Sequence, residues 1–442
     1  MFENKKIFIF GMAKSGYEVA KLLSKYNNEI VITDGKKQDE NHVKELEKLG
    51  VKVLITENQI DLIDESFDYM IKNPGIPANN KVVLKAKELG IKIINEIECA
   101  YHFLPRNVKI IGITGSNGKT TTTTMIYEIL KKQYKNVYLG GNIGYPLSQI
   151  VEKIKENSYL VMEISDHQLC DMYEFKTDIS LLLNLVHAHI DFHGSYEKYK
   201  EMKKRIFNNH SKNDLAILNY DNEDVLDLTK DIRSSKKYFS KSKKKDAYIK
   251  DATIYYKDEE IIECKDIKLK GIHNYENIMA AIIVLKDLKV DNKTIKKYLK
   301  TFGGVEHRIE FVKTIKGVDY YNDSKSTNNE ATITALKTFD NPTILIMGGL
   351  DRNIPFDELK EYMENVKAIV CYGETKEKIK KFANKNKIEC YVVDSLNAAI
   401  IRAHKISETG DTVLLSPACA SWDQFNSFEE RGNLFKELVN KL

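Results

Sequence analysis

The chain has 442 residues, which is longer than one ordinary domain. Its composition, 42% hydrophobic and 30% charged, is typical of a folded globular protein. Lys and Arg total 68 against 64 Asp and Glu, a near balance that excludes a histone-like or basic-arm nucleic-acid binder. The six cysteines form no C-x-x-C pair, which argues against a zinc ribbon or disulfide scaffold and fits a reducing cytosol. Apolar runs fall short of the ~18–20 residues of a membrane span. We therefore expect a cytoplasmic, multidomain protein.

Short apolar runs alternate with amphipathic stretches along the chain. Residues 7–10 predict a buried strand, residues 19–26 a helix, and the cycle repeats at residues 30–33 and 43–49. This alternation is typical of parallel sheets with crossover helices. The alternation of predicted strands and helices begins again at residues 109–114 and after Gly303-Gly304. We therefore expect three α/β domains, Rossmann-like at residues 1–103, P-loop ATPase-like with a mostly parallel sheet at 104–304, and Rossmann-like at 305–442.

The first domain carries Gly11-Met-Ala-Lys-Ser-Gly16 at a strand–helix turn, with Asp34 eighteen residues later. This pattern resembles the dinucleotide fingerprint G-x-G-x-x-G and its ribose-binding acid. Ala13 replaces the middle glycine, so close approach of a pyrophosphate is less easy. An oxidoreductase using NAD is thus one hypothesis, resting on this turn alone.

The strongest local signal is Gly115-Ser-Asn-Gly118-Lys119-Thr120, which follows the strand at residues 109–114 and opens a helix. Glycines let backbone N–H groups approach phosphate oxygens, a helix N-terminus favours anions, and the lysine reaches the outer phosphates. The match to G-x-x-x-x-G-K-[ST] is imperfect, because Ile113 stands where the first glycine belongs. The alternative is a tight turn with an exposed lysine; the threonine run after Lys119 favours a phosphate site.

Further along, the second domain offers an acid and a histidine cluster. Glu163 ends a predicted strand at residues 159–164, where a carboxylate is costly unless it binds a metal or a buried cation, and both alternatives stay open. A second strand is expected at residues 179–185. The segment after it, with His187, His189, Asp191 and His193, looks like the H-x-H-x-D-H motif of zinc hydrolases, but Phe192 breaks the spacing. A lone histidine is more often a satisfied polar residue than a ligand.

The remaining elements are simpler. The lysine-rich stretch at residues 236–250 is expected to be a solvated loop, and residues 253–262 predict a β-hairpin with its turn at 257–260. Strands of the third domain are expected at residues 343–347, 368–372, 391–393 and 412–415.

Together these segments resemble the Mur ligases over the whole chain, and the residues at 322–328 are similar to those of the D-glutamate-adding member. The further motifs are Gly271-Ile-His-Asn274-Tyr-Glu-Asn277, Glu306-His-Arg308, Asn322-Asp-Ser-Lys325-Ser-Thr327-Asn and Ser416-Pro-Ala-Cys-Ala-Ser421-Trp-Asp-Gln-Phe-Asn-Ser-Phe428-Glu-Glu-Arg-Gly. The last of these is the most specific.

The resemblance implies an ATP-dependent amide ligase that adds D-glutamate to UDP-N-acetylmuramoyl-L-alanine, through an acyl phosphate and a tetrahedral intermediate, in peptidoglycan precursor synthesis. The implied catalytic residues are Lys119, Glu163, His189 and Lys203. Two Mg²⁺ ions are implied, one on Thr120 and Glu163, the other on His189 and a carbamate of Lys203; Lys204 leaves a one-residue ambiguity. The implied ATP-binding residues are Gly115, Ser116, Asn117, Gly118, Lys119, Thr120, Thr121, Asn142, Asn274, Asn277, Arg308 and Asp323.

The resemblance also implies the two other substrate sites. D-glutamate is expected at Lys325, Thr327, Arg352, Ser421 and Phe428, although Arg352 could instead pair with Asp351 or Asp357. The UDP end is expected at Ala13, Lys14, Ser15, Asp34, Asn73 and Gly75. Members usually have Ser where Asn73 stands, and Ser-Phe where Asp166-His167 follow Ser165. These departures bear on fine substrate contacts.

Other functions weighed are another Mur ligase, a folylpolyglutamate-type ligase, and a nucleotide-binding regulator without enzymatic activity. The first domain and residues 416–432 weigh against the two other ligases, and Lys203 has no use in a regulator. An NAD oxidoreductase leaves Lys119 and Glu163 unexplained. We expect a monomer without nucleic-acid or membrane partners, whose domains close around the substrates.

Overall fold

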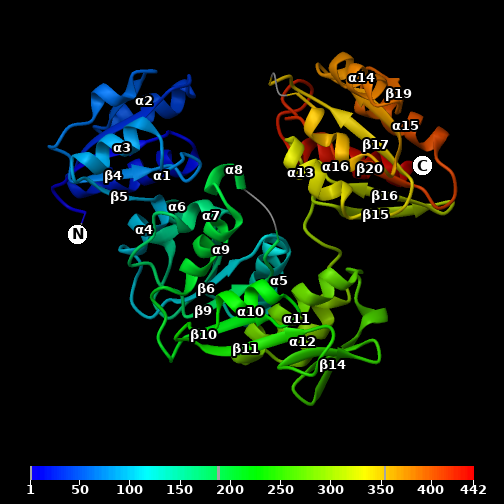
Figure 1. Ribbon diagram of the computed structural model, residues 1–442, viewed down its shortest axis with the longest axis horizontal. Coiled ribbons are helices and arrows are strands. Elements are labelled where there is room, and N and C mark those ends of the chain that lie inside the picture. Colours follow the sequence, from blue (N-terminus) through cyan, green and yellow to red (C-terminus); the bar gives the residue numbers. More distant parts are fainter. Residues whose placement is uncertain (1, 187–189, 353–354) are drawn as a thin grey trace. The chain divides into compact units, whose positions relative to one another are not determined.

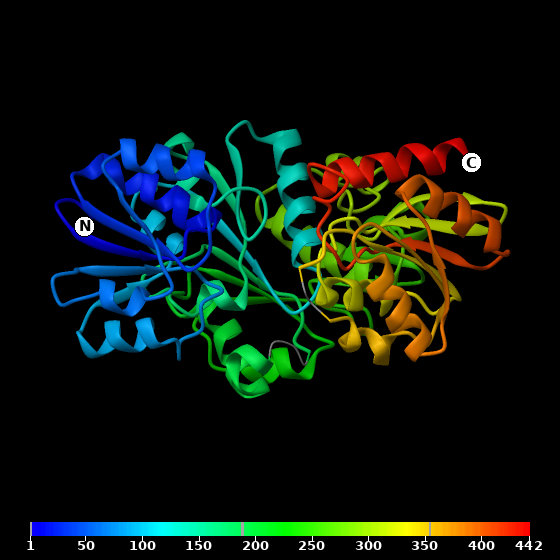
Figure 2. The same ribbon diagram turned by 90° about the horizontal axis from the view of Figure 1, so that it is seen from above.

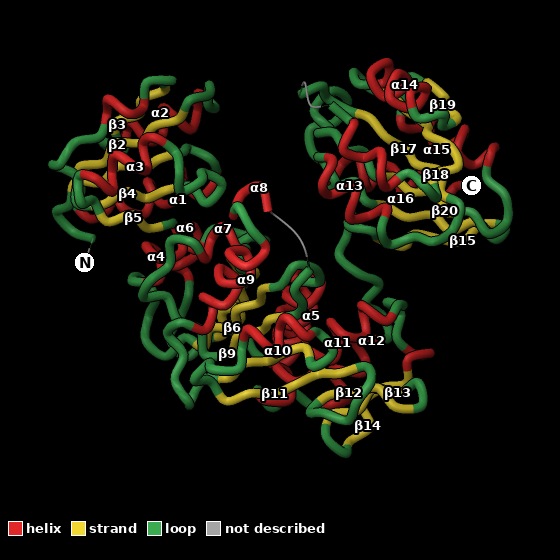
Figure 3. Tube along the Cα trace, viewed as in Figure 1, coloured by secondary structure: helices red, strands yellow, loops and turns green. Residues whose placement is uncertain are grey.

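The computed structural model describes residues 2–186, 190–352 and 355–442. The chain divides into two compact units, Met1–Phe302 and Gly303–Leu442. The first unit contains two sheets and the second contains one, with helices packed beside each sheet (Figure 1, Figure 3). Apolar cores line both faces of all three sheets. Among the described helices, none combines the length and apolar character that a membrane crossing requires.

Five parallel strands form the first sheet, in the order β3-β2-β1-β4-β5. Its elements are β1 (Lys6–Phe10), α1 (Lys14–Leu23), β2 (Glu29–Asp34), α2 (Glu40–Lys48), β3 (Lys52–Ile55), β4 (Tyr69–Lys72), α3 (Lys81–Glu88), β5 (Lys92–Ile94) and α4 (Glu96–Tyr101). The strands and helices expected up to residue 49 are confirmed as β1, α1, β2 and α2. Because the strands are parallel, the carboxyl ends of β1, β2 and β4 meet at one edge of the sheet.

The turn from β1 into α1 depends on a glycine. A Cβ atom on Gly16 would lie 2.0 Å from the carbonyl oxygen of Gly11, at the end of β1. Helix α1 therefore packs against the strand end more closely than any side chain permits. Close helix–strand packing is the role of the third glycine in the fingerprint at residues 11–16.

Nine strands form the central sheet, in the order β14-β13-β12-β11-β10-β9-β6-β8-β7. The strands are β6 (Lys109–Thr114), β7 (Val137–Gly141), β8 (Tyr159–Glu163), β9 (Ile179–Leu182), β10 (Leu215–Asn219), β11 (Ser235–Ser240), β12 (Ala247–Lys250), β13 (Thr253–Tyr256) and β14 (Glu259–Glu263). The helices are α5 (Lys119–Gln133), α6 (Leu147–Ile150), α7 (Asp166–Leu169), α8 (Ile190–His193), α9 (Tyr196–Lys204), α10 (Glu223–Leu228), α11 (Ile272–Asp287) and α12 (Asn292–Leu299). The strands from β7 to β12 in this order run parallel to one another, whereas β13 pairs antiparallel with β12. Strand β6 lies between β8 and β9.

The hairpin predicted at residues 253–262 is confirmed as β13 and β14, which pair antiparallel. The lysine-rich stretch predicted to be a loop is mostly not one, because it contains β11 and β12. Phe239 and Ala247 are buried there, between lysines that reach outward to acids such as Asp287 and Asp258. A few apolar residues thus place the stretch in the sheet despite its charge.

The two lobes of the first unit share one apolar core. It combines Leu22 of α1 and Ile97 and Ala100 of α4 with Leu147 and Ile150 of the central lobe. A nearly buried ion pair between Lys72 and Asp171, at 2.9 Å, also joins them. This shared core accounts for the first two sheets lying in one compact unit.

The second unit has a six-stranded sheet in the order β15-β16-β20-β17-β18-β19, in which only β15 runs antiparallel to its neighbour. Its elements are β15 (Glu310–Ile315), β16 (Val318–Asn322), α13 (Asn329–Leu336), β17 (Thr343–Gly348), β18 (Val366–Tyr372), α14 (Lys376–Lys385), β19 (Glu389–Val392), α15 (Leu396–Ile406), β20 (Thr412–Leu415) and α16 (Phe428–Lys441). The four strands predicted for this region are confirmed. Helix α16, red in Figure 2, packs on β15, β16 and α15.

We predict that Gly16→Ala destabilises the first unit by about 1–3 kcal/mol, because its methyl group overlaps the Gly11 carbonyl. Thermal unfolding should then shift down by several degrees. Gly35→Ala is the matched control, since the closest atom to a Cβ there is 3.9 Å away, and its midpoint should not move. Equal midpoints for both variants would contradict this reading of the turn.

Candidate active site

The phosphate loop at residues 115–118 joins the carboxyl end of β6 to the first turn of α5. Gly118 caps the helix with a φ of 82°, a left-handed conformation that favours glycine. A Cβ there would lie 2.1 Å from the side-chain oxygen of Asn277, on α11. The loop and Asn277, both predicted to bind ATP, are therefore in direct contact, while Asn274 sits one turn earlier and donates to the Lys270 carbonyl at 2.7 Å.

Asn184 fixes the shape of this loop. Its side-chain oxygen accepts from the Asn117 backbone N–H at 2.8 Å, its amide donates to the Asn117 carbonyl at 3.1 Å, and its own carbonyl accepts from the Ser116 N–H at 3.0 Å. The predicted strand at residues 179–185 ends earlier, at Leu182, because the chain leaves the sheet here to contact the loop. Sequence reasoning assigned no role to Asn184.

Lys119 folds back over its own loop. Its Nζ donates to the carbonyl oxygens of Gly115 and Ser116, each at 2.8 Å. The ammonium group is thereby held at the centre of the loop whose amides are expected to receive phosphate oxygens. Lys119 thus points into its own loop and not outward, as the predicted phosphate site requires.

Glu163 ends β8, the strand next to β6, and is buried. One carboxylate oxygen accepts from the Asn142 side chain at 2.7 Å. The other, Oε2, is buried and has no hydrogen-bond partner among the described residues. A buried carboxylate oxygen in this condition is costly unless a cation binds it.

This donor set fits Mg²⁺, which prefers oxygen ligands and is usually held by one or two carboxylates beside substrate phosphates. Glu163 offers the orphaned carboxylate oxygen, and Thr120, in the first turn of α5, is a second oxygen donor beside the phosphate loop.

Lys203, on α9, is fully buried beside the same strand ends. Its Nζ donates to Asp166 Oδ1 at 3.0 Å, to the Gly115 carbonyl at 3.1 Å and to Thr114 Oγ1 at 3.3 Å. Lys204 instead pairs with Asp231 at 2.9 Å, nearer the surface. Of the two lysines left open by the sequence, Lys203 is the one that faces the phosphate loop.

Asp166 stands where Mur ligases usually have serine, and its carboxylate contacts three side chains of this site. It begins α7 and is buried, with Oδ1 on Lys203. Its Oδ2 lies 2.8 Å from His193 Nε2 and 3.2 Å from His167 Nδ1. His193 is thus a hydrogen-bonded polar residue, the ordinary alternative weighed for it, and His187 and His189 lie outside the described residues.

Charges in this cluster shift two pKa values. Burial works to raise the pKa of Asp166, but the hydrogen bond from His167, the charge of Lys203 and the hydrogen bond from His193 together hold it well below its ordinary range. Burial, with the nearby charge of Lys119, lowers the pKa of Lys203 to about 7, although Asp166 and Glu163 act in the opposite direction. Lys203 is therefore a lysine with an accessible neutral form near pH 7.

The residues expected to contact UDP gather at the carboxyl edge of the first sheet. Asp34 accepts from the Met12 N–H at 2.9 Å, and Asn73 donates to Ser15 at 3.4 Å and accepts from the Gly75 N–H at 3.1 Å. The Lys14 ammonium reaches the central lobe, where it donates to the Gly144 carbonyl at 3.3 Å. Ala13 stands at the N-cap of α1. The structure thus brings all six predicted residues to one edge.

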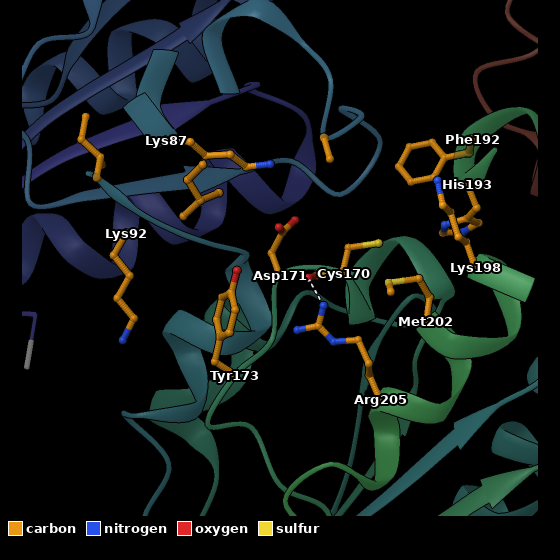
Figure 4. Close-up of a pocket in the computed structure, with 13 residues that line it drawn as sticks. Lys87, Lys92, Cys170, Asp171, Tyr173, Phe192, His193, Lys198, Met202 and Arg205 are labelled. Carbon is orange, nitrogen blue, oxygen red and sulfur yellow. Dashed lines mark hydrogen bonds between the residues drawn. The ribbon is translucent and has the colours of Figure 1, made fainter. Parts of the chain in front are cut away.

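A cavity of about 620 Å³ lies between the first and central lobes of this unit (Figure 4). Lys87 and Lys92 line it from the first lobe, and Tyr173, His193 and Arg205 from the central lobe. Its size is in the usual range for small-molecule sites. His193 lines this cavity and also bonds Asp166, so one ring links the cavity to the Lys203 cluster.

In the second unit, Arg431 joins two of the motif segments. This fully buried guanidinium donates to Ser324 Oγ at 2.8 Å, to the Ser324 carbonyl at 2.7 Å and to the Cys419 carbonyl at 3.1 Å. Asp323 is also buried and accepts from Ser416 Oγ at 2.7 Å. Burial raises the pKa of Asp323 to about 6, although hydrogen bonds from Ser326 and Ser416 and the charge of Arg308 lower it. The predicted ribose ligand thus sits inside the unit.

Four of the five residues expected to hold D-glutamate lie in two pairs. The fifth, Ser421, is buried. The Lys325 ammonium lies 5.9 Å from the centre of the Phe428 ring. Thr327 and Arg352 line one small pocket, and the Arg352 guanidinium lies 4.9 Å from the centre of the Trp422 ring.

Both acids proposed as alternative partners of Arg352 bond to lysines, Asp351 to Lys378 at 2.8 Å and Asp357 to Lys385 at 2.6 Å. Trp422, the only tryptophan of the chain, is 64% exposed beside Arg352. Sequence reasoning assigned no role to Trp422.

Known proteins resemble this chain over nearly its whole length. Three family models match successive parts of the chain: "Mur ligase MurD-like, N-terminal domain" at residues 5–95, "Mur ligase middle domain" at 113–285 and "Mur ligase, glutamate ligase domain" at 307–419. A UDP-N-acetylmuramoylalanine--D-glutamate ligase from Geobacillus sp. (strain WCH70) is 44% identical over 446 residues, covering 100% of this chain and 98% of that protein. The enzyme of the same name from Bacillus cereus (strain AH187) is 44% identical over 445 residues, with the same coverage.

Solved structures share the fold. The UDP-N-acetylmuramate-alanine ligase MurC from Thermotoga maritima aligns with a TM-score of 0.56 at 18% identity, covering 99% of both chains. MurF ligase from the same organism, in complex with ADP, aligns with a TM-score of 0.54 at 18% identity, covering 99% of this chain and 96% of that one. The three-domain α/β fold predicted from the sequence is confirmed. The chain belongs to the Mur ligase family and, within it, to the UDP-N-acetylmuramoylalanine--D-glutamate ligases.

Proposed function

We propose that this chain joins D-glutamate to the terminal carboxylate of UDP-N-acetylmuramoyl-L-alanine with ATP as the energy source, in the cytoplasm and as a step of peptidoglycan precursor synthesis. One observation carries the proposal. The loop that bears Lys119 follows β6, and the buried carboxylate of Glu163 ends the neighbouring strand β8. Oε2 of that carboxylate has no hydrogen-bond partner among the described residues. A monomeric state remains a prediction.

The phosphate loop would bind ATP by exchange of partners. Lys119 would give up the carbonyls of Gly115 and Ser116 and take β- and γ-phosphate oxygens. The N-terminus of α5 would add its positive end and its first backbone N–H groups to the same site. Asn142, Asn274 and Asn277 surround the nucleotide from this unit. Arg308 and Asp323 are proposed to approach it from the second unit.

Glu163 and Thr120 would hold Mg²⁺ at the nucleotide phosphates. Bound there, the ion supplies positive charge that offsets the negative charge of the transferring phosphoryl group. Asn142 keeps the Glu163 side chain oriented through the hydrogen bond at 2.7 Å, so that Oε2 remains the free ligand atom.

A second Mg²⁺ is proposed at His189 and a carbamate of Lys203. Support comes from the pKa of about 7 for Lys203, because only the neutral amine attacks carbon dioxide and that form is accessible near pH 7. A carbamate would turn a buried cation into an anionic oxygen ligand, the type that Mg²⁺ prefers.

The reaction has two steps. The substrate carboxylate attacks the γ-phosphorus of ATP, giving an acyl phosphate and ADP. The neutral amino group of D-glutamate then attacks the acyl carbon to give a tetrahedral intermediate, the nitrogen releases a proton, and phosphate leaves as the amide forms. Lys119 and the proposed Mg²⁺ ions would supply positive charge where this negative charge gathers. D-glutamate is held by Lys325, Thr327, Arg352, Ser421 and Phe428. The UDP end lies at Ala13, Lys14, Ser15, Asp34, Asn73 and Gly75.

The proposal is tested by incubating the purified chain with ATP, Mg²⁺, UDP-N-acetylmuramoyl-L-alanine and a panel of amino acids, and following phosphate release. We expect release that depends on D-glutamate and on the UDP substrate together. Release independent of D-glutamate, or release that prefers L-glutamate with a folate, would assign the chain to another reaction and contradict the proposal.

Replacing the loop lysine removes its cation from the phosphates. We predict that Lys119→Ala lowers D-glutamate-dependent phosphate release by about 10²–10³-fold or more. Lys132→Ala, an exposed change on the same helix, should keep the activity of the unchanged protein. A Lys119→Ala enzyme with near-normal turnover would show that the loop does not carry the nucleotide.

Removing the charge of Glu163 should weaken Mg²⁺ binding while leaving the side-chain shape intact. We predict that Glu163→Gln raises the Mg²⁺ concentration for half-maximal phosphate release by about 10–100-fold. The exposed Glu156→Gln is the control and should have an unchanged Mg²⁺ requirement. An unchanged requirement in Glu163→Gln would place the ion elsewhere.

A further inference from the structure

We infer that Asp166 competes with carbon dioxide for Lys203, and thereby sets the carbon dioxide concentration at which this lysine becomes a carbamate. The inference rests on the proposed carbamate and adds a residue that governs its formation. Asp166 acts through Lys203 and is therefore a positioning residue.

The ammonium form of Lys203 has a full set of partners. Its three N–H groups face three acceptors, Asp166 Oδ1 at 3.0 Å, the Gly115 carbonyl at 3.1 Å and Thr114 Oγ1 at 3.3 Å. Lys203 is fully buried, so water does not compete for these bonds. Carbon dioxide must therefore displace an existing partner in order to reach the nitrogen.

Carbamate formation removes most of these interactions. The ammonium group loses one proton, the nitrogen lone pair forms the N–C bond, the electron pair of one C=O bond moves to oxygen, and a second proton leaves nitrogen. The product nitrogen keeps one N–H, so two of the three acceptors lose their donor. The new carboxylate also lies close to Asp166, so an attraction between opposite charges becomes a repulsion between like charges.

Asp166 has other donors that can hold it in the carbamate state. Its Oδ2 lies 2.8 Å from His193 Nε2 and 3.2 Å from His167 Nδ1. Two alternative arrangements of the same cluster follow. Asp166 bonds Lys203 and both histidines when the lysine is unmodified, and the histidines alone when it is a carbamate.

The ordinary alternative is that Asp166 and Lys203 form a structural ion pair. A structural pair affects stability when it is broken, as buried pairs generally do. A pair with that role alone would keep Lys203 as an ammonium group, and no carbamate signal would form at any carbon dioxide concentration. Carbamate occupancy therefore separates the two readings, and it does so without measuring catalysis.

The experiment equilibrates the full-length protein with a series of ¹³C-labelled bicarbonate concentrations at one fixed pH and records the carbamate carbon by ¹³C NMR. Lys203→Ala identifies the signal by its loss. We expect Asp166→Asn to reach half occupancy at a carbon dioxide concentration about tenfold or more lower than the unchanged protein, because the competing charge is gone. Asp166→Ser should shift in the same direction, which guards against a folding defect in one variant.

The matched control is Asp214→Asn. Asp214 is a buried acid of the same lobe that pairs with Lys176 at 2.9 Å, away from Lys203, and its loss should leave the midpoint unchanged. Equal midpoints for Asp166→Asn and the unchanged protein overturn the inference. A missing signal in every protein overturns both the carbamate and the inference, whereas D-glutamate-dependent phosphate release tests the proposed reaction separately.

Discussion

The carbonyl oxygen of Gly115 accepts hydrogen bonds from two lysines, Lys119 at 2.8 Å and Lys203 at 3.1 Å. Two ammonium groups on one acceptor repel each other, and the charge of Lys119 is one reason why the pKa of Lys203 is low. In the proposed reaction Lys119 would move to a phosphate group and leave this carbonyl to Lys203 alone. The nucleotide loop and the buried lysine are thus electrostatically coupled through one backbone atom.

That coupling depends on the order of the central strands. β6 lies between β8 and β9, so the loop after β6 has Glu163 at the end of one neighbour and Asn184 just beyond the other. Parallel strands deliver their carboxyl ends to one edge, which lets residues far apart in the chain form one site. The net charge of +4 does not reveal this local concentration of charge, because basic and acidic residues nearly cancel over the whole chain. Exposed ion pairs elsewhere contribute little to stability.

Much of this site was predictable from local sequence. The phosphate loop and Glu163 each end a recognisable apolar run, and the period of the pattern predicted the strands that carry them. Asn184 and Asp166 were not predictable in their roles, because their bonds to residues 117 and 203 cross long stretches of sequence. The prediction of a loop at the lysine-rich residues 236–250 was wrong for a related reason. The charge of this stretch indicated a loop, but β10 and β13 pair with it on its two sides and its few apolar residues are buried. Arg431 was seen only as part of a motif, and its full burial depends on contacts with two distant segments.

The apolar core that α1 and α4 share with the central lobe has a practical consequence for dissecting this protein. Leu22, Ile97 and Ala100 cover Leu147 and Ile150, so cutting the chain near residue 104 would strip the central lobe of part of its own interior. The central lobe expressed alone would present that apolar surface to water and aggregate. A division after residue 302 instead opens none of these apolar cores, because residues 303–442 have cores of their own.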